Sequence, residues 1–149
     1  MDLTPLVDEL RKPEYQGKSD QEAADIINAK TVDIRREVPT WQLKRHAIEN
    51  GYWAAIKLAR ESAATPDALR GLCLSVLDWI DDPSGKTQSV DLDRPAVGTM
   101  LSSLVAAGLL TQQLADEIDA MADATIPWTE SVGLPEVGIG YVILAREAM

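Results

Sequence analysis

Apolar positions near the start of the chain recur with the spacing of a helix. Thr4 and Pro5 form a helix start, and the apolar residues of the next turns share one face until Pro13 ends the segment. Farther along, Ser19 and Glu22 have the spacing of a capping box, in which each side chain satisfies the other residue's backbone N–H. The pattern therefore predicts a short helix before Pro13 and a second helix from Ser19. The inner face of this second helix consists of Ala23, Ile26 and Ile27.

Two tandem helices and one longer helix are predicted in the middle of the chain. Thr40 caps a helix that runs to Ile48, and residues 50–51, Asn-Gly, separate it from a second helix that begins at Tyr52. Thr65 and Pro66 then repeat the threonine–proline start, and the apolar residues after them keep helical spacing through almost four turns. We expect this longer helix at the centre of the core. Its apolar positions are Leu69, Leu72, Cys73, Val76, Leu77 and Ile80.

Apolar and polar residues alternate in two short segments, which predicts two strands. The first runs from Thr31 to Val38, and Pro39 ends it; the second runs from Ser89 to Asp93 after a polar loop over residues 81–88. The two segments share a short sequence pattern. Either this likeness is chance, or the two strands pair in a small antiparallel ribbon beside the helices.

The rest of the chain returns to helical patterns. A helix is predicted from Pro95 to Ala107, closed by Gly108, and a further helix is capped by Thr111. A short helical turn at Trp128 stops at Gly133, and a last helix begins at about Gly140. Because no linker exceeds eight residues, we expect one compact multi-helix domain over residues 1–149, mainly α, with the small ribbon as its only sheet.

The amino-acid composition and net charge of the chain limit the kinds of partner that we expect. The chain has 149 residues, 46% of them hydrophobic, so it can bury a core without metals or disulfides. Its net charge of −10 repels phosphate backbones and anionic headgroups, so we expect no direct nucleic-acid partner and no membrane partner. Asp2, Asp8 and Glu9 stand where a secretory signal would have basic and apolar residues. A cytoplasmic or particle-bound protein is expected.

The charge is unevenly distributed along the sequence. Residues 61–149 contain four Lys/Arg and fourteen Asp/Glu, whereas residues 30–60 carry seven basic and three acidic residues, a local charge of +4. These basic residues either pair with acids of the same molecule or form a patch that meets the acidic surface of another copy, head to tail. The basic residues are Lys30, Arg35, Arg36, Lys44, Arg45, Lys57 and Arg60.

Residues that could carry chemistry lack the partners that they need. The run Ser84–Thr87 resembles part of a phosphate-binding loop, but Ile80 stands where that loop requires a glycine. His46 is the only histidine, and Cys73 is the only cysteine and lies on an apolar stripe. The aspartates of residues 78–93 lack the spacing of a calcium loop. We therefore expect no catalytic residue, no cofactor and no metal site, and a protein that is not an enzyme.

The four tryptophans divide into two pairs. Trp53 and Trp79 flank apolar stripes and are expected in the core or at its edge, whereas Trp41 and Trp128 begin helices and are expected to be more exposed. Exposed aromatic residues beside arginine are typical anchors of protein interfaces. Together with the basic patch they give six candidate interface residues: Arg35, Arg36, Trp41, Lys44, Arg45 and Trp128.

Two stretches of the sequence have a pattern in common with a known family. The first stretch is Tyr15–Asp20, continuing through Ala23-Ala24-Asp25 to Asn28, and the second is Gly133–Val137, with Val142 and Ala145-Arg146. In these residues the chain resembles small helical virion-assembly proteins of tailed bacteriophages, in the head–tail or tail structural module. The segment from Val32 to Ile48 is similar to the strand and Thr-capped helices that the family has between them. The polar loop at 81–91 is longer than in the shorter members and departs from the pattern.

This resemblance implies a non-enzymatic building block of the bacteriophage virion. We expect a connector or adaptor at the neck, or a tail-associated component, assembled in the host cytoplasm and present in several copies. Its partners would be other virion proteins and copies of itself. The alternative is a small acidic phage-encoded inhibitor that mimics DNA and occupies the groove of a host nucleic-acid enzyme. The basic residues of the 30–60 segment disfavour that alternative.

Overall fold

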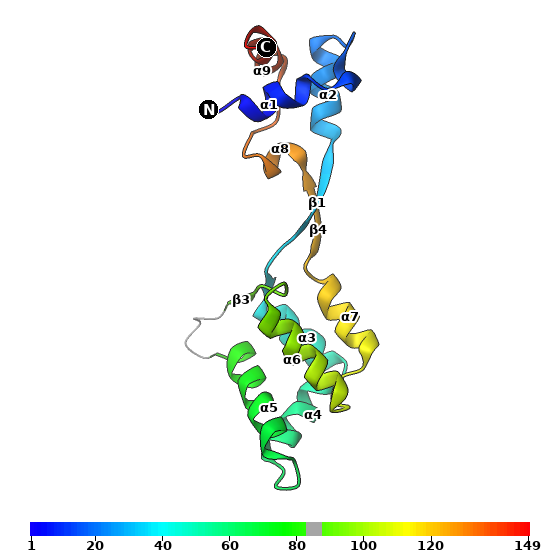
Figure 1. Cartoon of the computed structure of the whole chain (residues 1–149), viewed down its shortest axis with the longest axis vertical. Coiled ribbons are helices and arrows are strands. Elements are labelled where there is room, and N and C mark those ends of the chain that lie inside the picture. The colour runs from blue at the N-terminus through cyan, green and yellow to red at the C-terminus, as the bar shows by residue number, and fades with distance from the viewer. Residues whose placement is uncertain (83–87) are drawn as a thin grey trace. The chain divides into compact units, whose positions relative to one another are not determined.

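The structure is a computed structural model that describes residues 1–82 and 88–149, and it is mainly helical, as predicted. The chain divides into two compact units (Figure 1). Unit 1 combines both ends of the chain, Met1–Ile34 and Thr125–Met149, and unit 2 is Arg35–Ala124. Each unit has a hydrophobic cluster of its own. The single domain expected over residues 1–149 stays a prediction, because two clusters do not decide whether the chain unfolds in one step or two.

Unit 1 is built from helices that lie far apart in the sequence. Helix α9 packs against both α1 and α2, and α8 packs against α2, so the two ends of the chain share one core. The elements are α1 (Thr4–Leu10), η1 (Pro13–Tyr15), α2 (Asp20–Ala29), α8 (Trp128–Ser131) and α9 (Ile139–Glu147). The core residues are Leu6, Leu10, Tyr15, Ala23, Ala24, Ile27, Trp128, Leu134, Val137, Val142 and Ala145.

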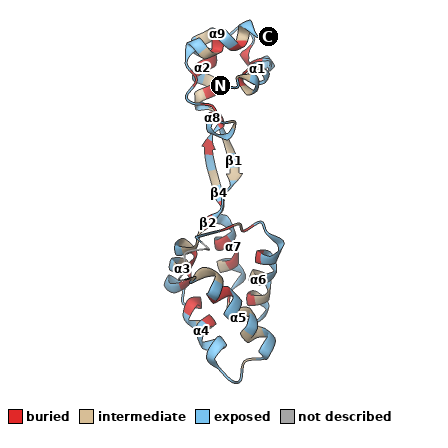
Figure 2. Cartoon of the chain, turned by 90° about the vertical axis from the view of Figure 1, so that its left-hand side faces the viewer, coloured by how far each residue is buried: buried red, intermediate tan, exposed pale blue. Residues whose placement is uncertain are grey.

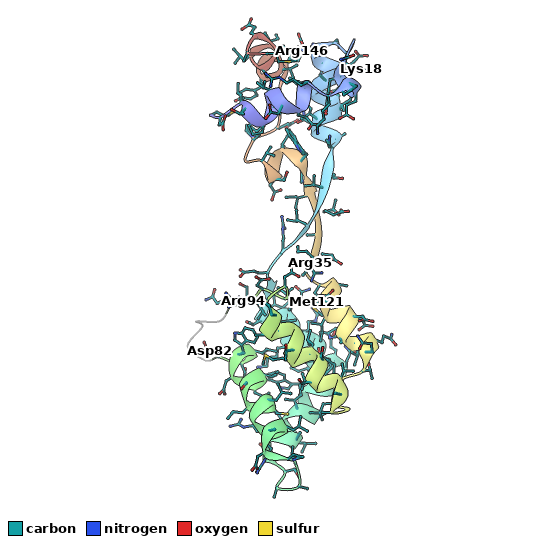
Figure 3. All side chains as sticks on the ribbon, in the orientation of Figure 1. Lys18, Arg35, Asp82, Arg94, Met121 and Arg146 are labelled. Carbon is teal, nitrogen blue, oxygen red and sulfur yellow. The ribbon has the colours of Figure 1, made fainter. Side chains whose placement is uncertain are left out.

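Polar contacts fix the two ends of the chain to each other. Asn28 Nδ2 donates to the Val137 carbonyl oxygen, and the Val137 N–H donates back to Asn28 Oδ1, both at 2.8 Å. Arg146 on α9 pairs with Asp20 and also donates to the Lys18 carbonyl oxygen at 2.8 Å (Figure 3). The capping box predicted at Ser19 is present and begins α2. The two stretches that carry the family resemblance are therefore neighbours in unit 1.

The sheets differ in part from the prediction. Strand β1 (Thr31–Arg35) pairs antiparallel with β4 (Asp123–Pro127), a segment for which the sequence analysis predicted no strand. Only the end of the first predicted strand, β2 (Val38–Pro39), pairs with β3 (Ser89–Val90), and Val38 lies opposite Val90. Pairing of the two segments, one of the two alternatives, is thus confirmed only at Val38 and at Pro39, the residue predicted to end the strand. The rest of the strand pairs with β4, whose residues Asp-Ala-Thr-Ile-Pro alternate between exposed and more buried positions, but the run is short and contains Asp, Ala and Pro, which are uncommon in strands.

Unit 2 contains the helices predicted for the middle of the chain. They are α3 (Thr40–Glu49), α4 (Tyr52–Glu61), α5 (Asp67–Ile80), α6 (Pro95–Ala106) and α7 (Gln112–Ala120). Gly51 and Gly108 adopt positive φ of 79° and 76° just after α3 and α6, where residues with a side chain are strained. Thr111 caps α7 as predicted. The α5 helix packs against α3 and α4, and each of these helices has buried positions among exposed ones (Figure 2).

A buried glutamate anchors the N-terminal part of unit 1. Glu9 on α1 is only 3% exposed, and it accepts hydrogen bonds from Lys12, Lys30 and the Tyr15 hydroxyl, the last at 2.9 Å. Burial by itself raises the pKa of Glu9, but the hydrogen bonds from Lys12, Lys30 and Tyr15 together outweigh it and hold the pKa at about 2. Glu9 is therefore ionised, and it holds α1 to η1 and to the residue that precedes β1.

A four-residue ion cluster closes one end of unit 2. Arg35 donates to Asp93 Oδ1, Asp119 Oδ1 and Asp123 Oδ1 at 3.0, 2.7 and 2.8 Å, and also to the Asp119 carbonyl oxygen at 2.9 Å. The hydrogen bonds that Arg35 donates to Asp123, Asp119 and Asp93 stabilise its charged form and raise the pKa of Arg35. Arg35 thus joins the end of β1 to the start of α6 and to the end of α7.

Replacing Glu9 should destabilise unit 1 in a pH-dependent way. The folded-state pKa lies below the ordinary value of 4.5, so its stabilising effect is complete above pH 4.5 and is lost as the pH falls towards about 2. Glu9→Gln should lower the free energy of unfolding by about 3 kcal/mol near neutral pH and by little at about pH 2. Urea unfolding followed by circular dichroism measures the difference. Glu14→Gln, an exposed partner of the same Lys30, is the control, and an equal loss at all pH values would contradict the assignment.

Removing Arg35 should destabilise unit 2 through repulsion among the three carboxylates that it holds. Arg35→Gln should lower the melting temperature, and high salt should reduce this loss because salt screens exposed charges. Arg94→Gln is a matched control, since it removes the same charge from a side chain that has no ion-pair partner among residues 1–82 and 88–149. If both variants melt at the same temperature at low salt, the cluster does not stabilise the unit.

Candidate interaction surface

One helix of unit 2 presents large exposed side chains in a row. On α3, Trp41 is 64% exposed, Ile48 is 56% exposed and the side chain of Arg45 is 69% exposed. These residues are four and seven positions apart, so they lie on one face of the helix. We name this row of Trp41, Arg45 and Ile48 the α3 stripe.

The local sequence explains why the α3 stripe faces outwards. Pro39 precedes the first helical residue, Thr40, and Gly51 ends the helix region, so the start and the end of α3 are fixed by local geometry. Leu43 and Ala47 are buried and lie one turn apart on the inner face. Because a helix turns by about 100° per residue, burial of Leu43 and Ala47 leaves the stripe on the opposite side.

The charges beside the α3 stripe are mostly paired within the chain. Arg45 Nε donates to Glu49 Oε1 at 2.8 Å, one turn along the same helix. Lys44 Nζ donates to Asp81 Oδ1 at 2.6 Å and lies 5.3 Å from the centre of the Trp53 ring. These contacts agree with the first of the two interpretations of the basic 30–60 segment, in which its basic residues pair with acids of the same molecule. Arg45 and Glu49 are more than half exposed, so their pair is weak and can exchange partners.

The six predicted interface residues occupy different environments. Trp41 is exposed, as predicted, whereas Trp128 is only 9% exposed and belongs to the core of unit 1. The prediction that Trp128 is exposed was wrong, because the residue that begins α8 is covered by contacts between segments far apart in the sequence. Arg35 is engaged in the aspartate cluster, and the Arg36 backbone N–H donates to the Ala122 carbonyl oxygen.

Ile48 is the member of the α3 stripe that the sequence analysis did not select. The pattern grouped it with the apolar residues of its helix, although it lies five positions after Leu43 and seven after Trp41. Five positions correspond to about 140° around a helix, which separates Ile48 from the buried face. The helical period of α3 alone could therefore have identified the complete stripe.

The only histidine braces three helices of unit 2. His46 Nε2 lies 2.9 Å from Glu117 Oε2 on α7, and Nδ1 lies 2.6 Å from the Tyr52 hydroxyl at the start of α4. Because a carboxylate only accepts hydrogen bonds, Nε2 donates to Glu117, and in a neutral ring Nδ1 accepts from Tyr52. Cys73 is fully buried, and burial raises the pKa of its thiol, so it behaves as a small core residue.

The acidic residues at 78–93 have mostly internal partners. Asp81 pairs with Lys44, Asp93 pairs with Arg35, and Asp91 accepts a hydrogen bond from the backbone N–H of Asp93. Within residues 1–82 and 88–149 no group of three or more potential metal ligands is present. None of the helices in this part of the chain has the length and apolar character needed to cross a bilayer. The run Ser84–Thr87 lies outside the described residues.

Comparison of the chain with protein-family models, with curated proteins and with solved structures gave no match.

Proposed function

We propose that this protein is a structural component of a tailed-bacteriophage virion, a connector or adaptor at the neck or a tail-associated component, and that it binds its neighbours through the α3 stripe. The observation that supports this proposal is the exposure of Trp41, Arg45 and Ile48 on one helix face. Its partners would be other virion proteins and further copies of the same chain. The residue patterns at the two ends of the chain supply the link to bacteriophages.

The composition of the α3 stripe suits a protein contact. Tryptophan and arginine are the residues most often found where truncation weakens a complex strongly, and an aliphatic neighbour excludes water around them. Leaving the Trp41 ring mostly in water costs free energy that a partner surface would recover. Arg45, a member of the stripe, pairs with Glu49, and because both side chains are more than half exposed, Arg45 can reorient towards charges on a partner.

The arrangement of unit 1 also supports the proposal. The stretches that resemble the phage family form one buried and hydrogen-bonded group, in which Asn28 meets Val137 and Asp20 meets Arg146. Val142 and Ala145, from the second stretch, are fully buried. Both stretches thus have the same structural task, to close unit 1, which gives a physical reason for their occurring together in one sequence.

The alternative function, inhibition of a host nucleic-acid enzyme by DNA mimicry, has less support. A DNA mimic needs rows of unpaired carboxylates that stand in for phosphates. Here Asp93, Asp119 and Asp123 converge on Arg35, and Glu117 lies against His46. These acids are oriented towards partners in their own unit and do not form a free anionic row.

Density-purified virus particles provide the first test of the proposal. Quantitative mass spectrometry should find peptides of this chain at a fixed ratio to the major capsid protein, because a structural component is present in constant copy number. Absence from intact particles would overturn the proposal. Salt-dependent binding of the purified chain to a nuclease would then favour the inhibitor.

A variant of the α3 stripe tests the contact itself. Trp41→Ala should lower the amount of the chain in particles by about tenfold or more, since loss of an interface anchor costs at least about 2 kcal/mol. Leu58→Ala is the matched control, because Leu58 is 67% exposed on α4 and lies outside the stripe. Equal incorporation of both variants would show that the stripe is not the contact, and unchanged circular dichroism would exclude misfolding as the cause of a loss.

A further inference from the structure

The outer side of α9 in unit 1 is apolar and exposed. Helix α9 packs against α1 and α2, and its residues Val142 and Ala145 are fully buried. On the other side of the helix Ile139, Ile143 and Leu144 are 43%, 41% and 53% exposed. Neighbouring apolar side chains that remain in water are typical of a contact surface. We name this side the α9 face and define it by five exposed residues: Ile139, Gly140, Ile143, Leu144 and Glu147.

The α9 face has a gap between its side chains at Gly140. Open space lies over Gly140, where any other residue would carry a Cβ. Ile143 and Leu144 stand about one turn farther along the helix, on the same side. A small residue among larger ones lets a bulky side chain of a second helix pack between them. The α9 face therefore suits a partner helix that presents one large apolar group.

The α3 stripe has the spacing that fits this face. Trp41 and Arg45 lie four positions apart on α3, which corresponds to about 6 Å along the helix axis. Ile143 and Glu147 have the same separation on α9. If the Trp41 ring of one molecule packs over Gly140 and Ile143 of another, Arg45 is brought to Glu147.

The charges of the two surfaces are complementary. Glu147 is exposed, and its carboxylate has no partner in the described part of the chain. Arg45 donates to Glu49 through Nε, so its Nη groups are able to donate to a second carboxylate. Unit 1 has five Lys/Arg and eleven Asp/Glu, whereas α3 and α4 together have four Lys/Arg and two Asp/Glu. The α9 face of one molecule therefore attracts the α3 stripe of another.

We propose that this protein assembles with copies of itself head to tail, with the α3 stripe of one molecule bound to the α9 face of the next. This inference rests on the part of the proposed function that makes the α3 stripe a contact, and it identifies the partner. Because the two surfaces differ, the contact is heterologous, and each molecule binds one neighbour through each surface. Burial of the apolar groups stabilises the contact, and the ion pair fixes its register.

Two complementary variants of the full-length chain test this contact in solution. Trp41→Ala removes the anchor of the α3 stripe and keeps the α9 face, whereas Ile143→Glu does the reverse. Analytical ultracentrifugation should show the wild-type chain in assemblies larger than a dimer as its concentration rises. Each variant alone should dissociate about tenfold or more easily. A mixture of the two variants should form a heterodimer, because one stripe and one α9 face remain intact.

Matched controls separate the contact from general effects of the substitutions. Leu58→Ala and Leu74→Glu change side chains that are 67% and 39% exposed and lie outside both surfaces, so they should assemble as the wild-type chain does. Circular dichroism should be the same for all variants. If Ile143→Glu misfolds, Glu147→Arg replaces it as the variant of the α9 face.

Charge reversal tests the register of the contact. Arg45→Glu or Glu147→Arg alone should raise the dissociation constant about tenfold or more at low salt, because charges of the same sign then meet. The two substitutions in one chain should restore assembly. Asp25→Arg changes the charge of unit 1 as much as Glu147→Arg does but lies outside the α9 face, so it should weaken assembly less.

The outcomes separate this inference from the proposed function. A wild-type chain that stays monomeric, or a mixture of the two variants that forms no heterodimer, would overturn the head-to-tail contact. If that chain is nevertheless found in particles and needs Trp41 there, the proposed function stands and another virion protein covers the stripe. Formation of the heterodimer by a chain that is absent from particles would support the contact and overturn the role in the virion.

Discussion

Two hydrogen bonds between residues 109 positions apart close unit 1. Asn28 on α2 donates to and accepts from the backbone of Val137, and so it fixes the segment that leads into α9 against the N-terminal helices. An amide group without hydrogen-bond partners in this partly buried place would lower the stability of the fold. The Asn28 side chain therefore requires a backbone segment that offers both an N–H and a carbonyl oxygen at this place. Because unit 1 needs both ends of the chain, unit 2 is a continuous insertion between them.

The second constraint is electrostatic. The chain has a net charge of −10 and only fourteen lysine and arginine residues, and several of these are committed to acids of their own unit. Lys30 serves Glu9, Lys44 serves Asp81, and Arg35 serves three aspartates. The strongest of these interactions is the buried one at Glu9, because the exposed pairs are screened by water and salt. The cations of the 30–60 segment therefore act first as structural groups.

One exposed feature beside these internal ion pairs is partly apolar, the α3 stripe. The α3 stripe places an aromatic ring, a guanidinium group and an aliphatic group in one row. This row follows from the packing of α3, which turns Leu43 and Ala47 inwards and Trp41 and Ile48 outwards.

The sequence by itself determined most of the helices and several of their ends, because these depend on residues a few positions apart. The cap predicted at Thr40 was wrong, since Thr40 is the first residue of α3 and Pro39 stands at the cap position without a side-chain hydrogen bond. The capping box at Ser19, the turns at Gly51 and Gly108 and the cap at Thr111 were all predicted and are all present. Only the tertiary structure decided that β1 pairs with β4, that Trp128 is buried and that Arg35 holds three aspartates. Each of these depends on segments separated by more than fifty residues, and local periodicity carries no information about which distant segments meet.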